Sequence, residues 1–294
     1  MRILLIVTAA ALAITVTVPV FAQSWNVSVD ANLTLTQNAY SDNWIRGESG
    51  ALAWTFNSNS LAEKQLHAKV HNKNTLKLFF GQTHNQNQVT KTWARPVKST
   101  DLIDFESVFR FTLGGFAEPF AAGRVETQFL DASDPEKDRF INPITFTESM
   151  GMAKVLIKKK KREWIARLGI GVRQHVNRDV LEPSGTSRKT HTSNDGGIVF
   201  VTDFKTPLAQ ERILYTGKLT IFKALFFSKA DELKGKPNEN YWKSPDLNWE
   251  NIFTASITKY VMVNFYLQLL YDKEINLKRR LKQTLALGLT YKLI

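Results

Sequence analysis

Apolar and polar residues alternate along most of this chain. In "WNVSVDANLTLTQ" one face receives Trp25, Val27, Val29, Ala31, Leu33 and Leu35, while small polar residues fill the other. The same period of two returns in "LHAKVHNKNTLKLFF", in "DLIDFESVFRFTLG" and, near the end, in "VMVNFYLQLLY". Because successive side chains of a strand point to opposite faces, this pattern predicts strands with one apolar and one polar face.

The pattern divides the chain into about twelve strands. We expect them near residues 24–37, 49–61, 64–81, 101–114, 119–131, 144–157, 163–176, 197–205, 211–226, 248–258, 260–272 and 281–294. Short connections are expected around Ala62–Lys64, Gly114–Pro119, Lys158–Arg162, Thr206–Gln210 and Lys259, and longer polar connections alternate with them. The phase is least regular in 144–157, where Glu148 and Lys154 fall on the same face as Ile144 and Met150.

Long strands joined alternately by short and long connections are typical of a transmembrane β-barrel. Most of the expected strands reach the about 9–11 residues that a tilted strand needs to cross the hydrocarbon core. A soluble β-protein, the main alternative, usually has strands of about 5–6 residues. The sequence therefore predicts an all-β fold, a single transmembrane antiparallel β-barrel of about twelve strands. An even number of strands with short periplasmic turns puts both termini in the periplasm.

The first residues read as an export signal. Arg2 supplies a positive start, Ile3 to Val20 an apolar core, and Val20-Phe21-Ala22 a small-residue cleavage site. We expect a signal peptide over 1–22 and the barrel, as one domain, over 23–294. The alternative is an uncleaved membrane anchor. The chain contains no cysteine, so no disulfide framework supports the exported protein.

Three short stretches stand out within the alternating pattern. They are "LTLTQNAYSDNWIRGESGALAW", "VETQFLDA" with its Thr127-Gln128-Phe129, and "FINPITFTESMGM" from Phe140 to Met152. Together they resemble an uncharacterised family of Bacteroidetes-type outer-membrane barrel proteins, a numbered domain of unknown function in the low three thousands. Arg46 stands where that family more often has glycine. The resemblance implies a barrel in the outer membrane, and it implies no established activity.

The first of these stretches would form the first outer hairpin. Gly47 and Gly50 are expected to let the chain turn and enter the second strand. Trp44 is expected to pack at the outer interface or over the barrel mouth, and Arg46 to face lipopolysaccharide phosphate or the lumen entrance. The last strand resembles the terminal strand that the barrel-assembly machinery recognises, although Ile294 is aliphatic and out of phase with Leu293.

The polar faces carry charges of both signs, which a barrel would direct into its lumen. The candidates for lining it are Lys69, Lys77, Arg110, Arg124, Arg167, Arg173, Lys218, Glu106 and Glu126. One interpretation is an interior network of ion pairs that fills the barrel, because unpaired buried charge is costly. The other is a narrow basic path that selects anions, as charged rings do in pores.

These interpretations give two leading functions and two lesser ones. The first is a narrow pore or transporter for small anionic solutes, and the second is a non-conducting structural or accessory barrel. A soluble periplasmic binding protein and a lipid hydrolase are less favoured. We expect no enzyme, because no Gly-x-Ser-x-Gly occurs and no histidine falls clearly on an apolar face. His67 and His71 would lie about 13 Å apart on a strand, too far to share a metal, so neither a metal nor a cofactor is expected.

The charge balance narrows the expected partners. The net charge is +12, and an exported basic chain suits anionic lipid and lipopolysaccharide phosphates rather than nucleic acid. The expected partners are therefore outer-membrane lipid, lipopolysaccharide and the barrel-assembly machinery, together with a protein partner that the sequence does not identify.

Overall fold

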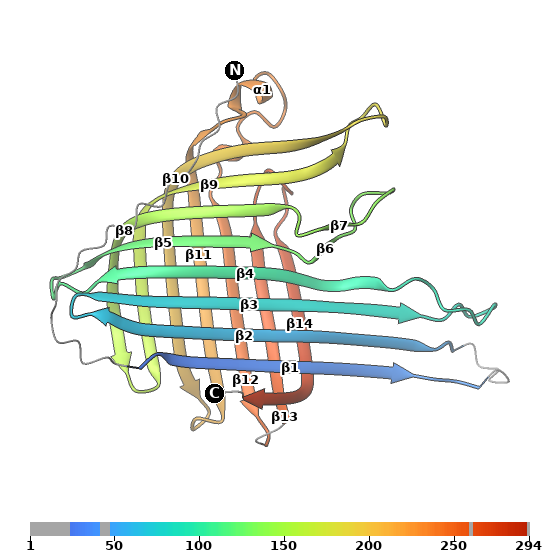
Figure 1. Cartoon of the computed structure of the whole chain (residues 1–294), viewed down its shortest axis with the longest axis horizontal. Helices are drawn as coiled ribbons and strands as arrows, with labels where there is room; N and C mark the ends of the chain where they lie inside the picture. The colour runs from blue at the N-terminus through green and yellow to red at the C-terminus, as the bar shows by residue number, and fades with distance from the viewer. Residues whose placement is uncertain (1–23, 42–47, 259–260, 293–294) are drawn as a thin grey trace.

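The computed structural model describes residues 24–41, 48–258 and 261–292, and its main feature is a closed antiparallel barrel (Figure 1). The wall contains β1 (Asn26–Asn38), β2 (Ala51–His67), β3 (Val70–Asn85), β4 (Val97–Phe111), β5 (Glu118–Thr127), β8 (Ile144–Lys159), β9 (Arg162–Leu181), β10 (Arg188–Leu208), β11 (Ile213–Phe227), β12 (Asp246–Ser256), β13 (Val261–Tyr271) and β14 (Arg280–Lys292). The predicted fold, an all-β antiparallel barrel of about twelve strands, is confirmed.

Three small elements lie outside the wall. β6 (Leu130–Asp131) and β7 (Arg139–Phe140) form a short hairpin between β5 and β8, and α1 (Ala230–Leu233) and η1 (Tyr241–Lys243) lie in the connection from β11 to β12. Over the residues described, no helix combines the length and the apolar character that a membrane crossing requires.

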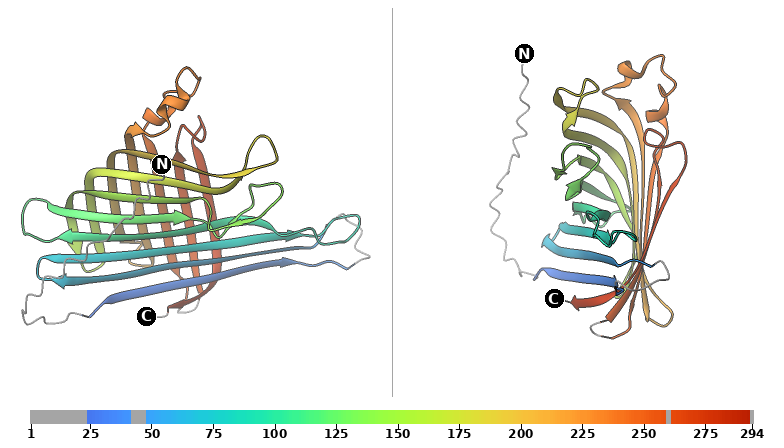
Figure 2. Two further views of the ribbon diagram at one scale, coloured as in Figure 1. Left: turned by 45° about the horizontal axis from the view of Figure 1, so that its top comes forward. Right: turned by 90° about the vertical axis from the view of Figure 1, so that its right-hand side faces the viewer.

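Each long strand pairs with the next one along the chain, and β5 pairs with β8 across the β6–β7 insertion. We name the ends of the barrel by their connections: the turn end carries the short turns and the loop end carries the long connections. Figure 1 and Figure 2 show two walls facing each other: β1–β5 cross β11–β14 at a steep angle, and β8, β9 and β10 bend from one wall into the other. The barrel is therefore flattened, and its facing walls come close enough for side chains to meet across the lumen.

Several predicted boundaries were wrong. The turn expected around Ala62–Lys64 lies at Ala68–Lys69 instead, because Glu63 pairs with Lys73 and the ladder continues to His67. β9 and β10 extend well beyond the predicted 163–176 and 197–205 at the loop end, where polar residues still form a paired ladder. The predicted turn at Lys259 falls outside the described residues.

The outward face of the barrel is apolar and exposed. Exposed outward residues include Leu168 at 57%, Ile170 at 62% and Leu285 at 72%. The irregular phase of 144–157 has a simple basis, because Glu148 lies on this outward face between Phe146 and Met150, and the Lys154 ammonium lies 3.2 Å from the centre of the Phe116 ring. A soluble protein rarely exposes so wide an apolar surface.

Two aromatic girdles border this surface. At the turn end, rings follow one another on five adjacent strands with centroids 4.9–6.1 Å apart: Trp164, Phe204, Tyr215, Phe253 and Phe265. Toward the loop end, Trp54, Phe80 and Phe129 form a second run with spacings of 5.7 and 5.8 Å. Such girdles mark the two interfaces of a membrane barrel.

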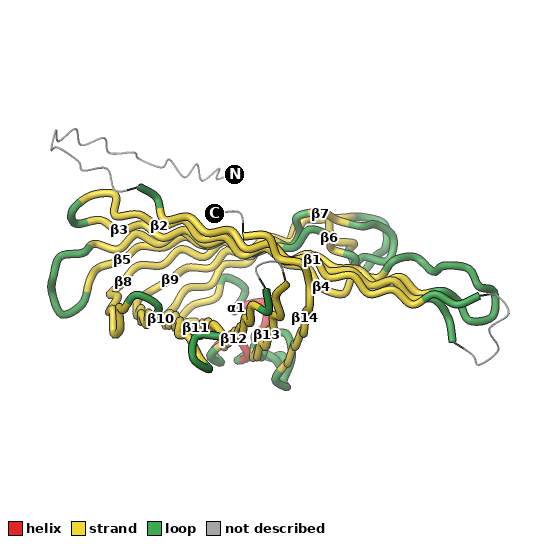
Figure 3. Tube along the Cα trace, turned by 90° about the horizontal axis from the view of Figure 1, so that it is seen from below, coloured by secondary structure: helices red, strands yellow, loops and turns green. Residues whose placement is uncertain are grey.

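The barrel closes at a short seam between β1 and β14. Among the described residues, only Asp30–Leu33 of β1 pair with Leu289–Lys292 of β14. In contrast, β1 pairs with β2 along its whole length. Figure 3 shows β1–β4 continuing past β14 as an extended ribbon. The outer part of β14 therefore has no ladder partner on its β1 side.

Gly50 in the first hairpin has a different role from the turn predicted for it. A Cβ on Gly50 would come within 3.0 Å of the Gln86 side chain and 3.1 Å of the Trp93 ring. The Gln86 side chain also accepts a hydrogen bond from the Gly50 amide. Gly50 thus allows the hairpin to approach the β3–β4 connection, while Trp44, Arg46 and Gly47 lie outside the described residues.

Candidate functional site: a charged layer across the lumen

A layer of ion pairs crosses the lumen at mid-height. We call it the ion-pair layer, and it consists of Lys77, Asp104, Glu106, Arg124, Arg167, Lys218 and Glu250. These residues come from β3, β4, β5, β9, β11 and β12, and the period of two directs each of them inward. All except Arg124, Lys77 and Lys218 are nearly inaccessible to solvent.

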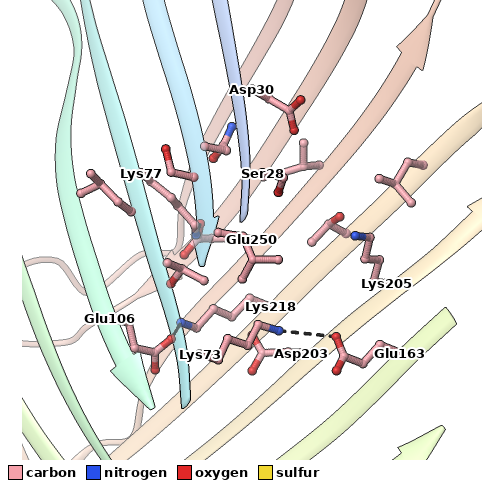
Figure 4. A pocket seen from close by; sticks show the side chains of 18 of the residues that line it. Ser28, Asp30, Lys73, Lys77, Glu106, Glu163, Asp203, Lys205, Lys218 and Glu250 are labelled. Carbon is pink, nitrogen blue, oxygen red and sulfur yellow. Dashed lines mark hydrogen bonds and ion pairs between the residues drawn. The ribbon is translucent and has the colours of Figure 1, made fainter. Parts of the chain in front are cut away.

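Three of the contacts join strands that do not neighbour each other in the wall. Lys77 on β3 donates to Glu250 on β12 at 2.5 Å, and Lys218 on β11 donates to Glu106 on β4 at 2.5 Å. Arg167 on β9 also donates to Glu106, at 2.9 Å. β3 and β12 lie on facing parts of the barrel, as do β4 and β11 (Figure 4), so the two lysine contacts tie the walls together through the lumen. The Arg167 contact joins β9 to β4, which β5 and β8 separate in the wall.

Further bonds hold the remaining members of the layer. The Arg124 guanidinium donates to both carboxylate oxygens of Asp104, at 2.7 and 3.1 Å, and to Glu126 at 2.5 Å. Arg167 reaches Asp203 at 3.2 Å. Paired charges of this kind offset the cost of leaving water, so the layer is a stable way to fill a narrow barrel.

A cavity of about 290 Å³, lined by both polar and apolar side chains, lies between this layer and the turn end. One side is lined by amide and hydroxyl side chains, among them Ser28, Asn57, Asn59 and Asn264. The other side carries charges, including the Lys73–Glu163 pair at 3.5 Å (Figure 4). The layer forms the floor of this cavity.

The lumen is also filled between the layer and the loop end. Phe79 on β3 meets Tyr266 on β13 with ring centroids 5.8 Å apart, and Lys282 on β14 donates to Thr100 on β4 at 2.8 Å. Arg173 pairs with Asp195 and with Asp246. Except for Arg173 with Asp195, which are cross-strand neighbours on β9 and β10, these contacts join strands that are not adjacent in the wall, so the obstruction extends beyond a single layer.

Most of the predicted lumen residues do lie inside the barrel. The ion-pair layer and its immediate surroundings contain Lys77, Arg124, Arg167, Lys218, Glu106 and Glu126. Nearer the turn end, Arg110 pairs with Glu118 at 3.1 Å. Arg173 lies in the loop-end half of the lumen. Lys69 does not line the lumen, because it occupies the exposed turn between β2 and β3. The shifted turn explains this error.

Sequence reasoning missed Glu163, Tyr266 and Phe79. Glu163 is the first residue of the strand predicted over 163–176, directly after the basic turn, and it shares the inward face of Arg167. The two aromatics face inward, as the alternation around Phe80 and Phe265 implies, but their apolar character gave no sign of a place among the lumen charges. Tyr266 approaches Glu250 at 3.5 Å and is 8% exposed, so it is a member of the filled lumen.

The two later motifs of the family resemblance bind each other at the loop end. Gln128 donates to the Asn142 carbonyl at 2.7 Å and accepts from Lys98 at 2.7 Å, while Thr127 donates to the Pro143 carbonyl at 2.8 Å. Both oxygens of Asp101 accept the amides that follow Gln128. The motifs therefore fix the connection 128–143 to the barrel mouth.

That connection, which we call the β6–β7 flap, is also bonded to the extended part of β9 and β10. Asn142 is 1% exposed and contacts Asp131 at 3.0 Å, Asn177 at 2.8 Å and the Arg178 amide at 2.8 Å. Hydrogen bonds from the Arg188 guanidinium hold the pKa of Asp134 well below its ordinary value. The flap is thus a fixed part of the loop end.

Comparison with known proteins agrees with the sequence resemblance over part of the chain. Residues 35–132 match the model of the family described as Protein of unknown function (DUF3078), and this segment includes the second motif and all but the first two residues of the first. The third motif lies outside the matched residues. No curated protein matches the chain.

Three solved structures with similar folds share little sequence with this chain. They include an outer membrane channel from Pseudomonas putida F1, with 12% identity, a TM-score of 0.40 and coverage of 90% of this chain and 93% of that one. The translocator domain of the autotransporter NalP from Neisseria meningitidis has 7% identity, a TM-score of 0.37 and coverage of 90% and 86%. The transport unit of the autotransporter AIDA-I from Escherichia coli has 10% identity, a TM-score of 0.31 and coverage of 91% and 89%.

Proposed function

We propose that this chain is an outer-membrane β-barrel that does not conduct in its resting state, and that it serves as a structural or accessory barrel. The observation that carries the proposal is the ion-pair layer, in which Lys77–Glu250 and Lys218–Glu106 bridge facing walls at 2.5 Å. A solute crossing the lumen would have to break buried ion pairs, which costs several kcal/mol for each unpaired charge.

The membrane location rests on the outward face. The apolar surface and its two aromatic girdles suit lipid, and the short turns then face the periplasm and the long connections face outward. We propose outer-membrane lipid and lipopolysaccharide as contacts, and delivery by the barrel-assembly machinery after removal of residues 1–22. Fractionation tests this location: we expect the protein in the outer membrane and slower migration of the heated sample in a gel. Release by osmotic shock without detergent would contradict it.

Planar-bilayer recording tests the closed lumen. We expect purified wild-type protein to insert without measurable conductance. The paired change Lys77→Ser with Glu250→Ser removes one bridge without changing the net charge, and we expect it to produce open-channel steps. The exposed pair Lys161→Ser with Glu211→Ser, at the turns of β8–β9 and β10–β11, is the control and should leave the barrel silent.

A pore for small anions is the second candidate. The observation in its favour is the cavity between the turn end and the layer, with Lys73 and Lys205 among its lining residues. Steady anion-selective conductance from the wild-type protein would support this function and overturn the first proposal.

We assign no catalytic role to the chain. The arrangement nearest to a catalytic one joins Thr145 to His175 at 3.1 Å, with Asp195 a further 3.8 Å from the imidazole. Thr145 and His175 are direct cross-strand neighbours on the lumen side, and Arg173 holds Asp195. A hydrolase acting on membrane lipid would need its nucleophile on the outward wall.

A further inference from the structure

The outer edge of β14 is unpaired where the barrel wall should be continuous. The ladder between β1 and β14 covers Asp30–Leu33 and Leu289–Lys292 among the described residues. Residues 280–288 pair with β13 on one side, and no described strand pairs with them on the other. The opposite lip of the gap is β1 from Thr34 to Asn38, whose other edge is fully paired with β2.

This unpaired edge lies at the level of the apolar band. Leu285 pairs with Phe265, a member of the turn-end girdle, and the edge runs from there toward the loop end. Its outward leucines are among the more exposed apolar residues of the barrel, with Leu281 at 66% and Leu287 at 62%. In hydrocarbon each unsatisfied backbone group costs several kcal/mol, so an open strand edge is not a stable state of a membrane wall.

Closure by β1 itself would break contacts across the lumen. β14 is held toward β4 by the hydrogen bond from Lys282 to Thr100, and β13 is held toward β3 by Tyr266 and Phe79. Moving β14 along β1 in the existing register would pair Leu287 with Leu35 and pull both contacts apart. The facing walls therefore keep the gap open.

We propose that the β14 edge is a docking site for an extended polypeptide segment of another protein, which adds as a strand between β14 and β1. The edge fits about nine residues, from Arg280 to 288. The segment would alternate, with apolar residues outward beside Leu281, Leu285 and Leu287 and polar residues inward beside Lys282. An acidic group at its loop end would meet Arg280, whose Nε is buried without a hydrogen-bond partner. Strand addition of this kind draws its affinity from main-chain hydrogen bonds.

The inference rests on the proposed membrane location and extends it by naming the kind of partner. Because the chain contains no cysteine, engineered cysteines report single positions. The probe is a synthetic peptide of residues 30–38, "DANLTLTQN", with cysteine at the position of Ala31, which lies opposite residue 287 when the nine-residue peptide pairs antiparallel with residues 280–288. The protein is the full chain carrying Leu287→Cys in detergent micelles.

We expect a disulfide between this peptide and Leu287→Cys. A peptide of the same composition in an order that destroys the alternation should form at least tenfold less of it. Leu267→Cys is the matched control, because β13 is paired on both edges, and it should link to neither peptide. Linkage of both peptides to both variants would overturn the proposal, as would the absence of any linkage.

Two further outcomes would also overturn it. If Leu35→Cys and Leu287→Cys in one chain form a disulfide in full before peptide is added, β1 closes the gap itself. If Leu287→Cys alone yields a disulfide-linked dimer, the occupant is a second copy of this chain. Neither readout depends on conductance, so failure here is distinguishable from failure of the closed-lumen proposal.

Discussion

Glu106 is a buried carboxylate in the lumen that pairs with two cations of the ion-pair layer. It accepts hydrogen bonds from Arg167 and Lys218, which approach from different strands, and it is 9% exposed. Removing its charge leaves two buried cations with fewer partners. Glu106 therefore contributes to the attraction between the facing walls at this height, together with the Lys77–Glu250 pair.

Replacement Glu106→Gln should therefore destabilise the barrel by about 3–5 kcal/mol, the usual cost of breaking a buried ion pair from one side. The free energy of unfolding in denaturant, with the protein in lipid vesicles, measures this. Glu211→Gln is the control, since its exposed pair with Lys161 should contribute no more than about 1 kcal/mol. Equal effects of the two changes would show that the layer is not a stabilising element.

Replacement of Glu148 should stabilise the barrel, whereas replacement of Glu106 should destabilise it. Glu148 is exposed on the outward face between Phe146 and Met150, where lipid would surround it. Glu148→Leu should raise the free energy of unfolding in vesicles by about 1 kcal/mol, because acidic residues on the lipid face cost less than basic ones. Glu232→Leu on the exposed α1 should leave it unchanged. A loss of stability for Glu148→Leu would indicate that this part of β8 does not meet lipid.

At the scale of elements, the β6–β7 flap depends on one buried amide. Asn142 bonds to Asp131, Asn177 and the Arg178 amide, and its side chain is nearly inaccessible. Asn142→Ala leaves those groups unsatisfied, at about 1–3 kcal/mol. We expect the flap to become sensitive to protease in intact cells while the barrel keeps its heat-modifiable migration. Loss of the folded barrel would contradict a role confined to the flap.

The flap should also respond to acid. The folded pKa of Asp134 lies below its ordinary value of 3.8 because Arg188 donates hydrogen bonds to it. The pair therefore stabilises the docked flap fully at neutral pH, and this contribution is lost as the pH falls from about 4 toward the lower folded pKa. A fluorophore on Pro135→Cys should lose anisotropy between pH 5 and pH 2. In a protein that also carries Asp134→Asn, the anisotropy of the same fluorophore should already be low at pH 5.

The strands show how much of the fold the alternation of apolar and polar residues can predict. Alternation located all twelve strands of the wall, because the lipid-facing and lumen-facing sides of a barrel impose it directly. It failed at strand ends such as Ala62–His67, since polar residues beyond the membrane still form a ladder. It also failed for the pairing of partners across the lumen. The contact between Lys77 and Glu250 depends on how far the barrel is flattened, and the sequence of a single strand does not determine that flattening.

At the scale of the whole molecule, the two faces of the wall reverse the usual arrangement of a soluble protein. The charged network lies inside and the apolar surface outside, with aromatic rings at both borders. The small inward apolar cluster of Val199, Val201, Phe222 and Ala224 is one exception, and Trp242 from the β11–β12 connection packs against it. Trp242 and Trp164 therefore sample opposite environments.

Quenching of tryptophan fluorescence by brominated lipid tests this inverted arrangement. The chain contains seven tryptophans, so the measurement uses two variants that retain only Trp164 or only Trp242, with phenylalanine at the other positions. Trp164 lies outward in the turn-end girdle and should be quenched strongly by lipid brominated near the headgroup. Trp242 packs against the inner cluster and should be quenched at most weakly. Equal quenching of the two would mean that the wall does not separate lipid from lumen, and the assignment of its faces would have to be reversed or abandoned.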